Sequence, residues 1–133
     1  MTAPGTSPKG KIVVVDDDQV TLTMLLGLLI RAGYRVFTAS DGETALEMIS
    51  AERPGLVITD FLIPKMDGLA LCSRIKADPG LARIPVVIMT AFKNAAVRFQ
   101  ARECKADGFV EKPLVMKDLL DLVAKLFVPE ESR

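Results

Sequence analysis

Five short apolar runs, each followed by a longer amphipathic stretch, constrain the fold of this chain more than any other feature. The runs cover residues 12–15, 34–38, 56–59, 84–89 and 108–110. The first, Ile-Val-Val-Val, is apolar at every position, as expected of a strand covered on both faces. Strands that alternate with helices form parallel sheets, because right-handed crossovers place a helix between consecutive strands. The pattern predicts an α/β fold, a doubly wound five-stranded parallel sheet in the order 2-1-3-4-5 with five helices.

The stretches between the runs carry helix start and stop signals. They predict helices over about 18–32, from Ser40 or Asp41 to a turn at 53–55, and over 69–76, 94–105 and 115–127. Asp18 and Asp67 are expected to cap the first and third helices, and Gly33 to end the first.

The length of 133 residues fits one domain. Residues 1–10 are rich in Pro, Gly, Ser and Thr and are expected to be a flexible N-terminal tail. We expect the folded domain over 11–128, with 129–133 as a C-terminal tail or the start of a linker. The chain would be a stand-alone domain, or a domain excised from a larger protein.

Composition excludes several function classes. Lys plus Arg equals Asp plus Glu at 17 each, which argues against a general nucleic-acid binder. The absence of histidine removes a histidine nucleophile, general base or metal ligand. Cys72 and Cys104 form no CxxC pair and are expected to be small buried hydrophobic residues in a reduced cytosol.

No segment is expected to enter a membrane. The longest uncharged stretch, 19–30, is well short of the ~20 residues that span a bilayer. The first ten residues also lack the apolar middle of a signal peptide. We therefore expect a cytoplasmic protein with no membrane partner.

Polar side chains follow four of the five strands. They are 16–18 after the first strand (three aspartates), Asp60 after the third, Thr90 after the fourth and Lys112 after the fifth. In doubly wound sheets ligands bind at these carboxyl ends, so the side chains would share one pocket. Crowded carboxylates need either a raised pKa or a cation, and oxygen ligands without His or Cys favour Mg²⁺. Asp60 could then be a nucleophile toward phosphorus, with Lys112 and Thr90 binding the phosphoryl oxygens.

Each of these residues also has a simpler explanation. The three aspartates could form a solvated turn with a helix cap, and Asp60 could be a turn residue. Thr90 could be a cap or turn hydroxyl, and Lys112 a surface lysine. All four explanations would have to hold together at matched strand ends, which is improbable.

Four segments together resemble the receiver domain of bacterial response regulators, the CheY-like family. They are VVVDDD at 13–18, VITDFLIPKMDG at 57–68, the dipeptide at 90–91 and ADGFVEKP at 106–113. The resemblance spans about 11–127. It implies a response regulator receiver of a two-component phosphorelay rather than a classical enzyme. Such a domain self-catalyses phosphotransfer and slow autodephosphorylation.

The resemblance implies a set of ligands for Mg²⁺. Asp17 matches the residue that ligates the ion most directly, and Asp16 binds it largely through water. Asp60 matches the phosphoacceptor and also contacts the metal. The backbone carbonyl of Leu62 matches the third protein ligand.

The resemblance also implies how the phosphoryl group is sensed. Thr90 and Lys112 match the phosphate-sensing pair, and Phe109 matches the switch aromatic. The Lys112–Pro113 peptide bond is expected to be cis.

The implied partners follow from the same resemblance. The donor would be a sensor histidine kinase or a histidine phosphotransfer protein. The readout would be a downstream target or output domain that binds the face of the fourth helix, fifth strand and last helix. A phosphorylation-dependent dimer through that face is a further expectation, and direct nucleic-acid binding by this domain is not expected.

Some positions depart from the commonest family pattern. Asp18 adds a third acid, interpreted above as a cap, and Phe109 replaces the tyrosine of many relatives. Leu62 and Phe92 are bulky and apolar near the expected pocket mouth. They could hinder hydrolytic water, so we hypothesise a long-lived phosphorylated state.

Three alternatives compete with this interpretation. Asp16, Asp18 and Val20 also fit a DxDx[T/V] pattern that resembles haloacid-dehalogenase-type phosphatases. That family needs a further acidic pair, and the pattern leaves Asp60 unexplained. A flavodoxin-like nucleotide or flavin carrier would need a Gly/Ser/Thr-rich loop where this chain has acids. The third alternative is a receiver-shaped scaffold that never takes phosphate, and the complete set of pocket residues argues against it.

Overall fold

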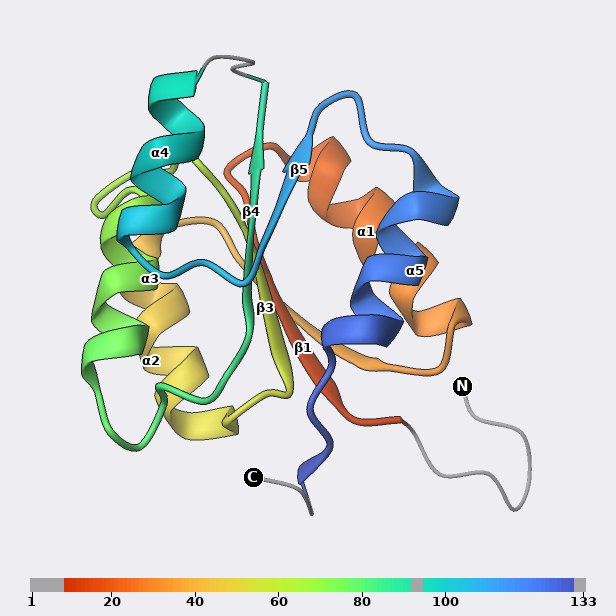
Figure 1. Ribbon diagram of the computed structural model, residues 1–133. Coiled ribbons are helices and arrows are strands. Elements are labelled where there is room, and N and C mark those ends of the chain that lie inside the picture. Colours follow the sequence, from red (N-terminus) through yellow and green to blue (C-terminus); the bar gives the residue numbers. More distant parts are fainter. Residues whose placement is uncertain (1–8, 92–94, 131–133) are drawn as a thin grey trace.

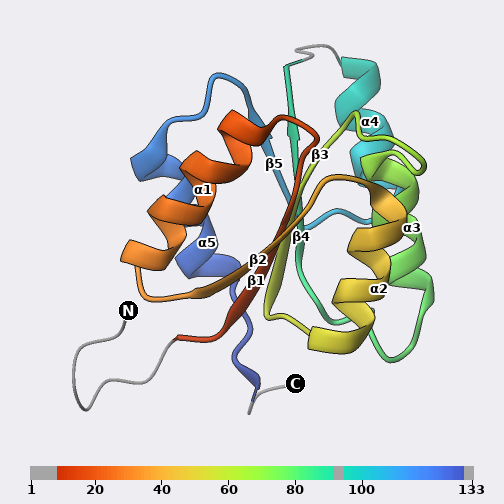
Figure 2. The same cartoon turned by 180° about the vertical axis from the view of Figure 1, so that it is seen from behind.

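All five predicted strands form one parallel sheet. The computed structural model describes residues 9–91 and 95–130. The strands are β1 (Lys11–Val15), β2 (Arg35–Ala39), β3 (Leu56–Asp60), β4 (Val86–Thr90) and β5 (Gly108–Glu111). Their order is β2-β1-β3-β4-β5, and every pairing is parallel (Figures 1 and 2). The predicted order is therefore confirmed.

Five helices cover the two faces of the sheet. They are α1 (Gln19–Arg31), α2 (Gly42–Glu52), α3 (Gly68–Ala77), α4 (Ala95–Glu103) and α5 (Met116–Leu126). Helices α1 and α5 lie on one face, and α2, α3 and α4 lie on the other, as both views show (Figures 1 and 2). No helix in the described part of the chain is long and apolar enough to cross a membrane.

The apolar strands bury side chains on both faces of the sheet. On β1, Val13 and Val15 point into the core under α2 and α3, whereas Ile12 and Val14 point into the core under α1 and α5. All four are fully buried. Because successive side chains of a strand point to opposite faces, an uninterrupted apolar run is what a sheet between two helical layers requires.

Aspartate side chains begin three of the helices. Asp18, Asp41 and Asp67 each accept a hydrogen bond from a main-chain amide two or three residues later, at 2.7–3.3 Å. The predicted caps Asp18 and Asp67 are confirmed, and Asp41 rather than Ser40 caps the second helix. These bonds satisfy amides that have no partner within the helix.

Two strands begin later than the sequence predicts. Gly33 has a φ of +105°, and the amide of Tyr34 donates to the Leu29 carbonyl at 3.1 Å, so Tyr34 closes the end of α1 and β2 starts one residue later. The fourth strand was expected from Ile84 but begins at Val86. The amide of Ile84 is used by the preceding turn, and the next residue, a proline, has no amide to offer the sheet.

Candidate functional site

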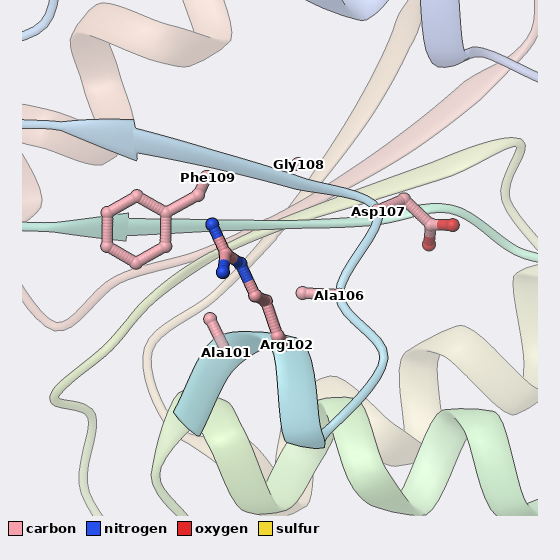
Figure 3. A pocket seen from close by; sticks show the side chains of 6 residues that line it. All are labelled: Ala101, Arg102, Ala106, Asp107, Gly108 and Phe109. Carbon is pink, nitrogen blue, oxygen red and sulfur yellow. The ribbon is translucent and has the colours of Figure 1, made fainter. Parts of the chain in front are cut away.

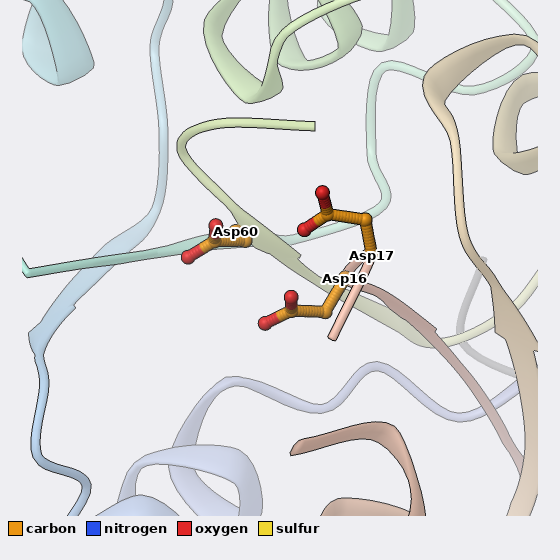
Figure 4. A group of neighbouring side chains, drawn as sticks. All are labelled: Asp16, Asp17 and Asp60. Carbon is orange, nitrogen blue, oxygen red and sulfur yellow. The ribbon is translucent and has the colours of Figure 1, made fainter. Parts of the chain in front are cut away.

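Three carboxylates meet at the carboxyl end of the sheet. Asp16 and Asp17 follow β1, and Asp60 ends β3 (Figure 4). One carboxylate oxygen from each residue lies within 4.8 Å of those of the other two. This is the only such group of potential metal ligands within residues 9–91 and 95–130. The predicted acidic cluster is therefore assembled by the fold.

Strand register explains why these acids meet. β1 and β3 are neighbours, and Val15 pairs with Thr59, so the residues that follow lie side by side. Asp16 is only 1% exposed, and its Oδ1 accepts a hydrogen bond from the amide of Asp18 at 2.9 Å. Because Asp18 in turn caps α1, the start of that helix fixes the loop that carries the acids.

Asp18 itself does not join the cluster. Its carboxylate accepts from the hydroxyl of Thr21 at 2.6 Å and from the amide of Val20. These hydrogen bonds, that of Thr21 first, lower the pKa of Asp18. The second aspartate of the DxD pattern is thus occupied in capping a helix, and this geometry does not support the phosphatase alternative.

Lys112 connects two of the acids. Its Nζ lies 3.1 Å from Asp16 Oδ2 and 2.9 Å from Asp60 Oδ1. The amide of Lys112 donates to the carbonyl of Thr90 at 2.8 Å, which fixes the end of β5 against β4, and the bond to Pro113 is cis. Burial lowers the pKa of Lys112, but its bonds to the two carboxylates outweigh burial and the pKa is raised overall. The ammonium therefore stays charged at neutral pH.

The charge of Asp60 is only partly compensated. Burial and the nearby charge of Asp16 raise the pKa of Asp60, against the opposing hydrogen bond from Lys112. Lys112 pairs with two of the three carboxylates, and a second cation would relieve the remaining repulsion. The oxygen-only ligand set suits a hard divalent ion such as Mg²⁺.

The other predicted site residues lie around this cluster. Thr90 is 1% exposed at the end of β4, the strand between β3 and β5. Leu62 lies two residues after Asp60 and is 54% exposed, as expected for the pocket mouth. Phe92 lies outside the described residues.

Phe109 lies on β5 and is half-buried. It lines a cavity of about 240 Å³ between β5 and α4, together with Ala101, Arg102 and Ala106 (Figure 3). In Figure 3 the Arg102 side chain extends beside the Phe109 ring. The aromatic residue therefore has space next to it at the α4–β5 junction.

One feature of the site was not foreseen from the sequence. Lys112 was expected only to attract phosphoryl oxygens, whereas in the structure it already bridges Asp16 and Asp60. The predicted strand order contained the information needed to foresee this bridge. Only β4 separates β3 from β5, and a lysine side chain is long enough to span that gap.

Comparisons with known proteins all identify the same family. The model of the response regulator receiver domain matches residues 12–124. The alkaline phosphatase synthesis transcriptional regulatory protein PhoP of Bacillus subtilis is 35% identical over 109 residues, which is 82% of this chain and 45% of PhoP. The chain spans less than half the length of the curated relatives it matches.

Solved structures agree with this assignment. The signal receiver domain of a histidine kinase from Syntrophus aciditrophicus is 35% identical, with a TM-score of 0.83 over 88% of this chain and 89% of that one. The receiver domain of the sensor histidine kinase PA1611 from Pseudomonas aeruginosa shares the fold at 24% identity and a TM-score of 0.82, over 88% and 96% of the two chains. That structure is described with a magnesium ion coordinated in its active site cleft. With its strand order, its acidic cluster and these matches, the chain belongs to the response regulator receiver domain family.

Proposed function

We propose that this domain is a phosphorylation switch whose acceptor is Asp60. The observation that carries the proposal is the convergence of Asp16, Asp17 and Asp60 with Lys112 at one end of the sheet. A carboxylate oxygen of Asp60 would attack the phosphorus of a phosphohistidine. The phosphorus–nitrogen bond would then break, and the imidazole would leave and take up a proton. The donor would be a sensor histidine kinase or a histidine phosphotransfer protein.

The residues present fit a bound Mg²⁺. Asp16, Asp17, Asp60 and the backbone carbonyl of Leu62 would hold it, and the crowded oxygen donors are what a hard cation prefers. The magnesium described for the Pseudomonas receiver supports this assignment. When bound, such an ion neutralises charge on a phosphoryl group in transfer.

Lys112 and Thr90 would sense the new group. Phosphorylation adds roughly −1.5 to −2 charge if Asp60 behaves as other phosphorylated side chains do. Lys112 already contacts Asp60 and would bind the added oxygens. The Thr90 hydroxyl would donate to the same oxygens, and Phe109 would turn into the space that Thr90 leaves.

This rearrangement would shift the equilibrium between two states of the α4–β5–α5 face. A group shifts such an equilibrium only by its differential affinity for the two states. The face would then bind a downstream target or output domain, or a second copy in a phosphorylation-dependent dimer. Residues 11–128 would form the switch itself, in the cytoplasm.

The exposed side chain of Leu62 bears on the lifetime of the phosphorylated state. A bulky apolar group at this position would hinder the water that hydrolyses an acyl phosphate. Leu62→Asn should therefore speed dephosphorylation, measured as loss of the phosphorylated mass with time. An unchanged rate would contradict this part of the proposal.

Acetyl phosphate tests the central step. Asp60 would attack the phosphorus and release acetate, so intact mass should rise by one phosphoryl group in the presence of Mg²⁺. Asp60→Asn should abolish the gain, whereas Asp121→Asn, an exposed acid on α5, should not. In the presence of Mg²⁺, Lys112→Ala should weaken the response to phosphorylation. It should lower the stability of the fold to a smaller extent. Labelling that persists in Asp60→Asn would overturn the assignment.

A further inference from the structure

The two cysteines, 32 residues apart in the sequence, meet in the core. Cys72 lies within α3 and is fully buried, and Cys104 is the first residue after α4 and is 7% exposed. Both are free thiols and belong to the same apolar cluster between the sheet and the helices of that face. No other cysteine exists in the chain.

The contact between them is direct. The thiol of Cys72 donates to the backbone carbonyl of Cys104 at 3.2 Å. The Cys104 thiol donates to the carbonyl of Ala101, in the last turn of α4, at 3.0 Å. The Cys72 sulfur is thus in contact with residue 104, and a disulfide would require the Cys104 thiol to leave the Ala101 carbonyl.

We propose that Cys72 and Cys104 are a modification site that closes to an intrachain disulfide under oxidation by peroxide. Hydrogen peroxide would oxidise the more exposed Cys104 thiol to a sulfenic acid, releasing one water. The Cys72 sulfur would then attack the Cys104 sulfur, the sulfur–oxygen bond would break, and the second water would leave with the Cys72 proton. The two thiols lose two hydrogens in total, and the peroxide is reduced to two waters.

Burial makes Cys104 the point of entry. Burial, and next the Cys104 thiol, raise the pKa of Cys72. Cys72 also has no exposed surface, whereas Cys104 has some. Cys104 is therefore oxidised first, and the Cys72 thiol then attacks the Cys104 sulfur to form the disulfide.

The disulfide would join α3 to the carboxyl end of α4. The last residues of α4 and the turn after it, including Ala101, Arg102 and Ala106, line the cavity beside Phe109. Oxidation would restrain one wall of that cavity. Under reducing conditions the bond would open and release the wall.

Mass spectrometry tests the proposal on the full chain. After hydrogen peroxide, the intact mass should fall by two hydrogen atoms, and the count of free thiols in denaturant should fall from two to none. A non-reduced digest should contain one peptide pair that joins Cys72 to Cys104, and dithiothreitol should restore both thiols. The oxidised protein should also show slower amide hydrogen exchange in α4.

Controls separate this site from the phosphoacceptor. Cys72→Ala and Cys104→Ala should each abolish the loss of hydrogens, whereas Asp60→Asn should leave it intact, because the disulfide does not depend on phosphorylation. If either alanine variant folds poorly, the digest of the oxidised wild type still shows whether Cys72 is joined to Cys104. Oxygen addition at Cys104 with a free Cys72 thiol, or a disulfide between two chains, would overturn the proposal.

Discussion

Asp60 would have to stay ionised to act as the proposed nucleophile, yet its surroundings oppose its charge. Burial is the largest cause of its raised pKa, Asp16 adds to it, and the hydrogen bond from Lys112 only partly compensates. A carboxylate held in this way destabilises the native state when it is ionised. At the proposed acceptor, the fold would therefore give up stability for chemistry.

Asp60→Asn should stabilise the metal-free protein. The amide keeps the shape of the side chain and removes the repulsion with Asp16, although Lys112 loses one of its two partners. Urea unfolding at neutral pH in a chelator should show a gain on the order of 1 kcal/mol, the usual size of a single-substitution effect.

Added Mg²⁺ should make the wild type more stable than Asp60→Asn. Binding to the native state stabilises it by mass action, and the wild type has one more carboxylate for the ion. Asp121→Asn provides the control, because this exposed acid pairs with Lys117 on the surface and should change stability by less than about 0.5 kcal/mol. A less stable Asp60→Asn in chelator would show that the Lys112 pair outweighs the repulsion.

Tyr34 provides a pH-dependent test that is independent of the site. It is the only tyrosine, the chain has no tryptophan, and burial raises its pKa above 10.0. The unfolded chain therefore loses the phenolic proton first, so stability should fall as pH rises from the unfolded pKa through the folded one. Ultraviolet absorbance should show phenolate forming at higher pH in the native protein than in urea.

Tyr34→Phe isolates this contribution from the titration of the lysines. The variant keeps an aromatic ring to face Phe127, whose ring centroid lies 5.1 Å from that of Tyr34. Above pH 10 its stability should fall less steeply than that of the wild type. Parallel curves for the two proteins would show that the phenol is solvated in the folded state.

At the scale of single elements, local sequence determined where helices begin better than where strands begin. Asp18 and Asp67 were predicted as caps because a short carboxylate before an apolar stripe has few other uses. The start of β2 was misplaced by one residue because the amide of Tyr34 belongs to the end of α1. Apolar periodicity does not show such competition between two elements for one amide.

The end of α4 contains a residue in an unfavourable conformation. Lys105 has a φ of +66°, and its amide and that of Ala106 donate to the carbonyls of Arg102 and Ala101. This is the position after a helix where glycine is normally found. Lys105→Gly should therefore stabilise the protein by roughly 0.5–1 kcal/mol, measured by urea unfolding.

Lys125→Gly is the matched control for this change. Lys125 is an exposed residue in the last turn of α5, where the backbone is helical. Glycine there should cost about 1 kcal/mol. Equal effects of the two substitutions would mean that side-chain loss, rather than backbone conformation, sets the stability at residue 105.

At the scale of the whole molecule, strand order made the site predictable. Once β1 and β3 are neighbours, Asp16, Asp17 and Asp60 must lie close together, and this follows from alternation and crossover handedness. The bridging position of Lys112 and the contact between the cysteines did not follow. Both depend on how long side chains and helix ends pack across the sheet, which sequence spacing does not encode.

The chain after α5 closes the opposite end of the molecule. The Phe127 ring packs on Tyr34 and covers Gly10 and Gly55, where a Cβ on either glycine would collide with the ring. The amide of Val128 donates to the Gly55 carbonyl at 3.1 Å. One side chain thus connects the last helix to the segments that lead into β1, β2 and β3.

Phe127→Ala should therefore lower the stability of the whole domain. A fully buried phenylalanine costs about 3–5 kcal/mol when truncated, and this half-buried ring should cost about 2 kcal/mol. The melting temperature should fall by roughly 5–10 °C in a single transition. Far-ultraviolet circular dichroism and Tyr34 fluorescence should report the same midpoint.

Phe99→Ala makes the same chemical change on α4, where the ring is 61% exposed, and should alter stability by less than about 0.5 kcal/mol. Similar losses in both variants would mean that the ring of Phe127 adds no packing energy. Two separate transitions in Phe127→Ala, with α5 melting first, would mean that the ring fixes only the last helix. A single shifted transition is expected, because removing the ring weakens contacts with the segments that lead into three strands of the sheet.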